Sequence, residues 1–230
     1  MKLNPSARVR RTTVGHEALP LLVIDDFVSD PDALVQHAAG RLFTERWRWF
    51  PGIRTRAPLA WRRLVVGELG DLLRQFFGLG RCSLGFSMCH YSLITTPADR
   101  LAMPQRIPHF DSLGSDGIAS IHYLFRAPHG GTAFYRHRRT GFESVDESRR
   151  DAYFAALEPE LAGRDAPPAA YIDGDTALFE RVHAESGRFN RILFYRRNAL
   201  HSGSIGKDFV PDADPLTGRL SINSFIDPGT

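Results

Sequence analysis

Two histidines and an aspartate in this 230-residue sequence have the types and the spacing of metal ligands. His109 and Asp111 are separated by one residue, and because side chains alternate along an extended strand, both would point to the same face. His201 follows the apolar run 192–195. Two neutral imidazoles and one carboxylate form the facial triad that binds non-haem iron(II) and leaves positions open for substrate and oxygen. A His-x-Asp pair is also common in turns and on surfaces, and this alternative stays open.

A second polar group lies on a late strand. In the segment 218–226, alternation puts Arg219, Ser221 and Asn223 on one face and Leu220 and Ile222 on the other. If the polar face points inward it needs an anionic partner, because an arginine offers a planar fork to a carboxylate and a serine two residues on can donate to the same group. An exposed sheet face with ordinary alternation would give the same letters.

Five short motifs give the chain a family resemblance. In order they are His109-Phe110-Asp111, Ile121-His122-Tyr123-Leu124-Phe125, Gly130-Gly131-Thr132-Ala133-Phe134, His201-Ser202-Gly203 and Gly218-Arg219-Leu220-Ser221. This order resembles the iron(II)- and 2-oxoglutarate-dependent dioxygenases. The chain is most similar to the prolyl-4-hydroxylase-like branch, in which a Gly-Gly-x-x-Phe segment follows the His-x-Asp strand and a basic residue lies on a late strand. The likeness covers about 84–136 and 189–226, together with the opening segment 23–28.

The resemblance implies a fold and a chemistry. The fold would be α+β, a double-stranded β-helix (jelly roll) with supporting N-terminal helices. His109, Asp111 and His201 would ligate Fe(II), Arg219 would pair with the far carboxylate of 2-oxoglutarate, and Ser221 would assist. Tyr91 matches the position of a tyrosine that hydrogen-bonds the same carboxylate in such enzymes, although a core tyrosine remains an equal alternative. With molecular oxygen, the site would hydroxylate a C–H bond of a small-molecule or peptidyl substrate.

Substrate contacts are expected from two segments that flank this site. The first contains Trp49, Phe50, Arg54 and Arg56, and the second is 136–139, with three arginines and a histidine. Arginines would favour an acidic substrate, while a solvated loop predicts the same letters. His122 could face the same cavity, although a hydrogen-bonded core histidine is the favoured interpretation.

The elements that must position these residues follow from periodicity and turn residues. We expect a flexible arm over 1–18 and a single jelly-roll domain over 19–230, with a helical insert around 140–188 that would be a lid or an oligomer contact, such as that of a homodimer. Within the domain the pattern predicts a strand at 21–24, a helix at 32–39, an irregular aromatic loop at 40–58 and a helix at 59–77. Further strands are predicted at 84–94, 105–111, 117–126, 131–136, 189–196, 199–203 and 218–226, and helices at 146–161 and 175–185.

Composition limits the remaining function classes. With 43% hydrophobic and 24% charged residues the chain is an ordinary globular protein, and no apolar run approaches the roughly 18 residues of a membrane span. Only the net charge of +3 would support nucleic-acid binding, because the sequence contains no recognised nucleic-acid-binding motif. Cys82 and Cys89 lack a CxxC spacing and indicate reduced thiols, and with no secretory signal visible we expect a cytoplasmic protein.

One rival from a different class shares the expected fold. A catalytically silent jelly-roll (cupin-like) module would serve as a binding or assembly protein. The complete set of His109, Asp111, His201, Arg219 and Ser221 argues against it, because a silent relative has no chemical reason to keep all five.

Overall fold

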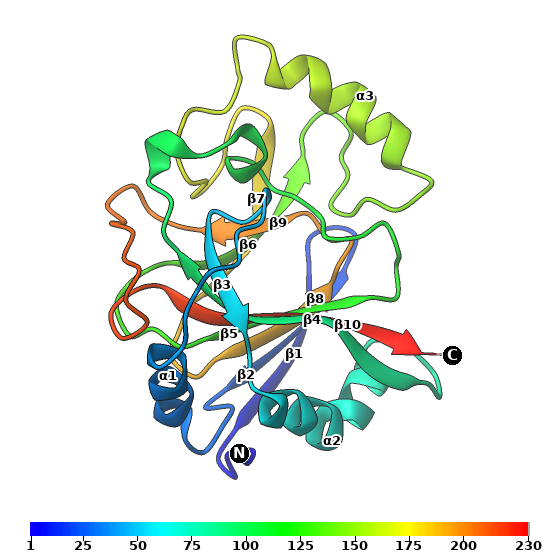
Figure 1. Ribbon diagram of the computed structural model, residues 1–230. Coiled ribbons are helices and arrows are strands. Elements are labelled where there is room, and N and C mark those ends of the chain that lie inside the picture. Colours follow the sequence, from blue (N-terminus) through cyan, green and yellow to red (C-terminus); the bar gives the residue numbers. More distant parts are fainter. Residues whose placement is uncertain (230) are drawn as a thin grey trace.

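Two antiparallel sheets form the framework of the computed structural model, which describes residues 1–229 (Figure 1). The large sheet has the order β1-β2-β8-β5-β10-β4-β3 and the small sheet the order β7-β6-β9. The large sheet comprises β1 (Arg8–Val14), β2 (Leu19–Asp25), β3 (Gly52–Arg56), β4 (Ser83–Ile94), β5 (Ile118–Tyr123), β8 (Ile192–Arg196) and β10 (Leu220–Gly229). The small sheet comprises β6 (Gly131–His137), β7 (Phe179–Ser186) and β9 (His201–Ser204). The predicted double-stranded β-helix is confirmed.

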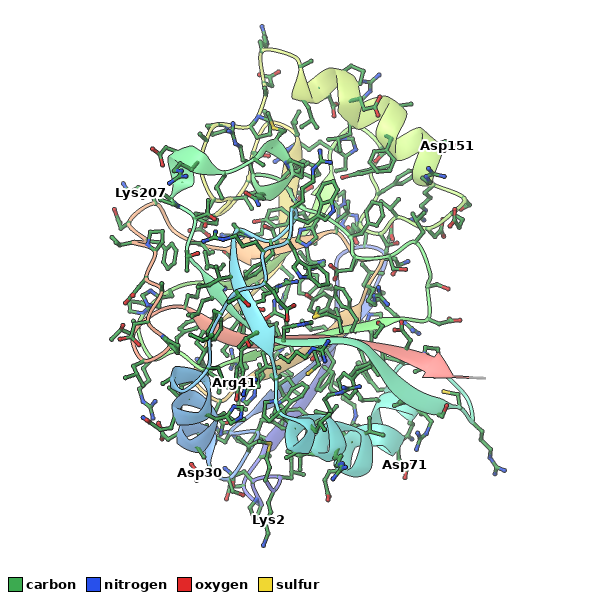
Figure 2. The ribbon with its side chains drawn as sticks, in the orientation of Figure 1. Lys2, Asp30, Arg41, Asp71, Asp151 and Lys207 are labelled. Carbon is green, nitrogen blue, oxygen red and sulfur yellow. The ribbon has the colours of Figure 1, made fainter. Side chains whose placement is uncertain are left out.

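Three α-helices flank the sheets: α1 (Pro31–Ala39), α2 (Leu59–Phe76) and α3 (Arg150–Leu161). Short 3-10 turns also occur at Ala98–Arg100 and Met103–Gln105. Figure 1 shows α1 and α2 beside the large sheet and α3 at the opposite end of the molecule. Asp71 on α2 and Asp151 on α3 mark these two ends in Figure 2. The N-terminal helices therefore support the large sheet, as the resemblance implies.

The two N-terminal helices form for local reasons. The Asp30 side chain accepts a hydrogen bond from the amide of Ala33 at 3.0 Å, and Pro31 occupies the first turn of α1, where a missing N–H does no harm. In α2 the buried residues recur at three- and four-residue spacing, and they are Trp61, Leu64, Val65, Leu69, Gly70 and Leu73. Each large apolar side chain buried in this way contributes about 1.5–3 kcal/mol.

Strand alternation divides the interior of the molecule into two sides. On β10, Leu220 and Ile222 belong to the core cluster beside α1 and α2, whereas Asn223 lines a cavity on the opposite face together with Arg219, which directly precedes the strand. On β4, Leu93 lies on the helix side and Ile94 on the cavity side. The inner face of the large sheet, opposite the helices, therefore forms one wall of a cavity.

Two strands lie where the sequence predicts irregular chain. β1 pairs along its whole length with β2, inside the segment 1–18 that we expected to be a flexible arm. Its arginines are largely exposed, as is typical of an edge strand. Such a charged segment lacks the apolar residues from which a strand is predicted. β3 pairs with β4 inside the expected aromatic loop 40–58, so that loop is in fact shorter.

Two predicted elements are wrong. The helix at 175–185 is replaced by β7, because pairing with β6 outweighs the helix-favouring Glu, Arg and Ala residues of this segment. The strand at 105–111 is reduced to a single bridge between His109 and His201. Pro108 has no amide hydrogen for a ladder, which explains the interruption.

The two cysteines and the helices agree with the composition of the chain. Cys82 and Cys89 are both free, and Cys89 is buried in the helix-side core as a small apolar residue. None of the helices within residues 1–229 combines the length and the apolar character that a membrane crossing requires.

Candidate metal centre and its cavity

Three side chains with metal-ligating atoms converge at the cavity, namely His109, Asp111 and His201, and their ligand atoms all lie within 4.8 Å of one another. His109 Nε2 is 3.7 Å from Asp111 Oδ1, and His201 Nε2 is 3.5 Å from Asp111 Oδ2. The centroids of the two imidazole rings are 4.5 Å apart. The structure therefore brings together all three residues predicted as ligands.

Backbone hydrogen bonds fix the two segments that carry these side chains. The amide of His109 donates to the carbonyl of His201 and the amide of His201 donates back to His109, both at 2.9 Å. The amide of Asp111 donates to the carbonyl of Arg197 at 2.7 Å. Residues distant in sequence are thus held together by main-chain hydrogen bonds rather than by bonds between their side chains.

The surroundings of the two histidines favour metal binding in different ways. His201 Nδ1 lies 2.9 Å from the carbonyl oxygen of Ala199, and because that oxygen only accepts, Nδ1 carries the proton and Nε2 keeps its lone pair. For His109, desolvation and then the neighbouring His201 lower the pKa to about 4. At neutral pH the His109 ring is therefore uncharged and able to donate an electron pair.

The three residues fit a divalent transition metal. Ligand atoms about 2.1 Å from one ion and at right angles to each other lie about 3 Å apart, slightly less than the 3.5 and 3.7 Å measured here. Small side-chain rotations would close the difference. A set of two imidazoles and one carboxylate on one face is the donor set of non-haem iron(II) sites.

The cavity beside the triad has a volume of about 640 Å³ and a mostly apolar lining. Residues of both sheets contribute to it, and so do the loop before β3 and the helix α3. The aromatic residues of the lining are Trp47, Trp49, Phe50, Phe110, Tyr153, Phe154, Tyr171, Tyr195 and Phe225. The insert that contains α3 therefore forms a wall of the cavity through residues such as Phe154 and Leu157.

Arg219 is a buried cation in the wall of this cavity. Its Nε donates to the carbonyl of His129 at 2.8 Å and its Nη2 to that of Gly131 at 2.7 Å. Within residues 1–229, no carboxylate oxygen lies within 4.0 Å of the Arg219 guanidinium, the limit for an ion pair. Burial lowers the pKa of Arg219. A buried guanidinium held by carbonyls alone is suited to an anionic ligand.

Ser221 lies on the predicted face of β10 but not in the cavity lining. Its hydroxyl donates to Oδ1 of Asn223 at 2.7 Å, and Asn223 does reach the cavity. The predicted alternation of Arg219, Ser221 and Asn223 is therefore confirmed. Only Arg219 and Asn223 reach the cavity.

Tyr91 is the predicted site residue that the structure corrects. It points to the helix side of β4, where its hydroxyl donates to the carbonyl of Leu34 at 3.0 Å. Because alternation places it one residue out of phase with Ser92, which lies on the other face, it has no access to the cavity. His122 is likewise a core residue: Trp61 Nε1 donates to its Nδ1 at 3.2 Å, and its Nε2 lies 3.2 Å from Asn190 Oδ1.

The two segments expected to contact substrate have different positions. From the first, Trp49, Phe50 and Arg54 line the cavity, whereas Arg56 does not. The second, 136–139, lies outside the lining. Arg136 pairs with Glu143 and Glu180, His137 with Thr140 and Glu160, and Arg138 with Asp175.

Sequence reasoning missed several polar and aromatic residues close to the triad. Tyr195 has its ring centroid 4.7 Å from that of His201, and Thr132 and Ser202 line the cavity from the small sheet. Alternation along β8 could have revealed Tyr195, because Phe194 belongs to the helix-side core and its neighbour must face the other way.

Comparisons with known proteins agree with this description of the fold. The family described as "Family of unknown function (DUF6445)" matches residues 5–226. The crystal structure of HygX from Streptomyces hygroscopicus with nickel and 2-oxoglutarate bound is similar, with a TM-score of 0.56 and 13% identity over 92% of this chain and 84% of that one. The epimerase SnoN in complex with Fe3+, alpha ketoglutarate and nogalamycin RO gives a TM-score of 0.51 and 14% identity over 90% and 78%. No curated protein matches the chain in sequence. What is shared at these identities is the fold.

Proposed function

We propose that this chain, which belongs to the DUF6445 family, is an iron(II)- and 2-oxoglutarate-dependent oxygenase. The observation that carries the proposal is one cavity holding both the triad of His109, Asp111 and His201 and the buried Arg219, whose guanidinium has no ion-pair partner in the described chain. A metal site alone fits many activities. A metal site facing an uncompensated arginine fits a co-substrate that chelates the metal at one end and carries a carboxylate at the other.

The fold supports this assignment independently of the site. HygX and SnoN are solved with a metal ion and 2-oxoglutarate (alpha ketoglutarate), and the chain shares their architecture. Within the superfamily we propose the prolyl-4-hydroxylase-like branch, because the Gly130-Gly131 pair, whose second residue begins β6, lies between the His-x-Asp segment and the strand that follows Arg219.

Each residue then has a defined task. His109, Asp111 and His201 would hold the iron, and Arg219 would bind the far carboxylate of 2-oxoglutarate, with Ser221 assisting by orienting Asn223. Bound iron and 2-oxoglutarate supply the oxidising chemistry: molecular oxygen is consumed, the co-substrate gives succinate and carbon dioxide, and a substrate C–H bond becomes C–OH. The protein excludes water with its apolar lining and fixes which C–H bond is presented. A volume of about 640 Å³ suits a small molecule.

The proposal is tested by adding iron(II) and 2-oxoglutarate anaerobically to metal-free protein and recording the visible charge-transfer band of the chelate. We expect the band in wild type and its loss in His201→Ala, because one of three ligands is removed. His16→Ala is the matched control, since His16 is exposed and is not one of the three residues of the triad. A folded wild-type protein without the band would leave the catalytically silent jelly-roll module as the better account.

Arg219 provides the second prediction. In Arg219→Gln we expect the dissociation constant for 2-oxoglutarate to rise roughly 10- to 150-fold, the equivalent of about 1.5–3 kcal/mol for a charge-assisted hydrogen bond. Iron(II) binding alone should not change, because Arg219 is not a ligand. The measurement is a titration of the same band with co-substrate, with the exposed Arg56→Gln as control. An unchanged constant in Arg219→Gln would remove Arg219 from this role.

A further inference from the structure

A second buried arginine faces the same cavity, and the proposed chemistry does not use it. Arg54 lies on β3, the edge strand drawn in cyan in Figure 1, and is only 7% exposed. Its guanidinium carbon is 4.0 Å from the ring centroid of Phe50 and 5.1 Å from that of Trp47. The two rings hold the cation in place through cation–π contacts and leave its hydrogen-bonding edge available.

The guanidinium of Arg54 has no hydrogen-bond acceptor within residues 1–229. Its Nε is buried and unpartnered. The acidic groups whose charges act on it are Asp111 and Glu45, and neither lies within 4.0 Å. Asp111 faces the two histidines, and Glu45 pairs with His90 at 3.0 Å. Burial lowers the pKa of Arg54 to about 10, so that it stays a cation at neutral pH. A buried unpaired charge is costly, which indicates that a ligand completes it.

Charge balance shows which ligand is missing. A divalent metal, the Asp111 carboxylate, the two carboxylates of 2-oxoglutarate and Arg219 sum to zero. Arg54 then leaves one positive charge in the lining, because Glu45, whose charge also acts on Arg54, lies outside the lining and pairs with His90. The only other acid in the described lining, Glu158, is exposed on α3. An anionic group on the primary substrate would give Arg54 the partner that the described lining does not supply.

We infer that Arg54 recognises an oxyanion, such as a carboxylate, on an otherwise apolar primary substrate. This inference rests on the proposed function for the reaction, and it adds the substrate class. The planar fork of arginine matches a carboxylate. Around it Trp47, Trp49, Phe110 and Phe154 offer apolar surface for the rest of the molecule. Binding by Arg54 would fix one end of the substrate relative to the triad, which positions the C–H bond.

The test compares two fluorescent probes that differ in one anionic group, namely anilinonaphthalene sulfonate and the neutral N-phenylnaphthylamine. Both are titrated into metal-free wild type, Arg54→Gln, Arg54→Lys and Arg56→Gln. Arg56 is the matched control because it is exposed on the same strand and outside the lining. We expect Arg54→Gln to weaken binding of the sulfonate by at least about tenfold and of the neutral probe by less than about twofold. Arg54→Lys should retain most of the affinity, and Arg56→Gln all of it.

A second measurement avoids dependence on a variant that fails to fold. In wild type, octanoate should displace N-phenylnaphthylamine at a concentration at least about tenfold lower than octanamide does. The same ratio should persist in Arg219→Gln, which separates the two arginines. The inference would be overturned if Arg54→Gln weakened the binding of both probes equally. It would also be overturned if octanoate lost its advantage over octanamide in Arg219→Gln.

The two proposals can fail separately. Arg54→Gln should keep the charge-transfer band with iron(II) and 2-oxoglutarate, because Arg54 is neither a proposed iron ligand nor the residue proposed to bind 2-oxoglutarate. A missing band in wild type contradicts the oxygenase and leaves the probe titrations informative about Arg54. A normal band with probe binding that is indifferent to Arg54 contradicts the anionic substrate alone.

Discussion

At the scale of residues, one step along a strand decides whether a side chain belongs to the site. Tyr91 and Ser92 are consecutive on β4, yet Tyr91 bonds to Leu34 on the helix side, while Ser92 pairs across the sheet with Arg54 and Ser221. The hydroxyl of Ser92 is buried without a partner. Chemistry-bearing residue types therefore identify a site only once the phase of their strand is known.

The corrected place of Tyr91 leads to a prediction. Tyr91→Phe removes a buried hydrogen bond to a carbonyl and should lower the free energy of unfolding by about 0.5–1.5 kcal/mol, or more if the Leu34 carbonyl stays unpaired. The affinity for 2-oxoglutarate should not change. Ser92→Ala is the matched control and should not destabilise, because its hydroxyl has no partner to lose. Urea unfolding and co-substrate titration measure both effects, and a weaker co-substrate affinity in Tyr91→Phe would return Tyr91 to the site.

At the scale of elements, an ion-pair network joins the edges of the two sheets. Glu185 on β7 accepts from Arg10 on β1 at 2.6 Å and lies 2.9 Å from His183 Nε2, and Arg191 is 3.4 Å away. Arg191 in turn binds Asp25 at the end of β2. This network explains how a charged segment such as β1 is stably ordered as an edge strand.

Acid should weaken this network in a defined range of pH. Burial alone would raise the pKa of Glu185, but the hydrogen bonds from His183 and Arg10 outweigh burial and lower it to about 2. Its stabilisation is therefore complete above the ordinary carboxyl pKa of 4.5 and is lost as the pH falls toward 2. Glu185→Gln should unfold more easily than wild type at pH 7, by on the order of 2 kcal/mol, and the two proteins should converge near pH 2. A difference that does not depend on pH would contradict the ionic origin.

Local sequence patterns predicted those elements whose signal is local. The helix stripe of α2, the cap at Asp30 and the strands β4, β5, β6, β8, β9 and β10 all follow from spacing and turn residues. β1, β3 and β7 exist because distant strands pair with them, and no short window of sequence contains that information. The convergence of His109, Asp111 and His201 was expected from motif order and occurs despite the missing strand at 105–111, with a single bridge joining His109 to His201.

At the scale of the whole molecule, a buried hydrogen-bonded chain connects helix, sheet and loop. Trp61 on α2 donates to His122 on β5, and because Nδ1 of His122 accepts, its Nε2 carries the proton toward Asn190. The Asn190 side chain also bonds both the amide and the carbonyl of Val28. His122 is therefore neutral, and the fold depends on its staying so.

His122 should make the molecule sensitive to mild acid. Burial lowers its pKa to about 4, whereas the unfolded chain binds a proton near the ordinary value of 6.5. Stability therefore falls as the pH drops from 6.5 to 4, by roughly 3 kcal/mol from this residue. His122→Gln should be less stable than wild type at pH 7, with a difference that shrinks by about that amount at pH 4. Unfolding curves measured at both pH values provide the check, and parallel pH profiles would exclude His122 as the source.

The lining of the cavity comes from two kinds of segment. The triad and Arg219 lie on or beside the β-framework, whereas Trp47, Trp49 and Phe50 come from the segment before β3, and Phe154 and Leu157 come from α3. Neither of these wall segments supplies a metal ligand or Arg219. The start of the α3-containing segment is tied to the triad, however, because the backbones of Glu143 and Val145 bond to those of Leu200 and Asn198 beside His201. The segments 40–51 and 146–170 can therefore vary in length and composition while the strand pairing beside the triad and Arg219 is kept, and exchanging either segment between homologues should change the shape of the cavity.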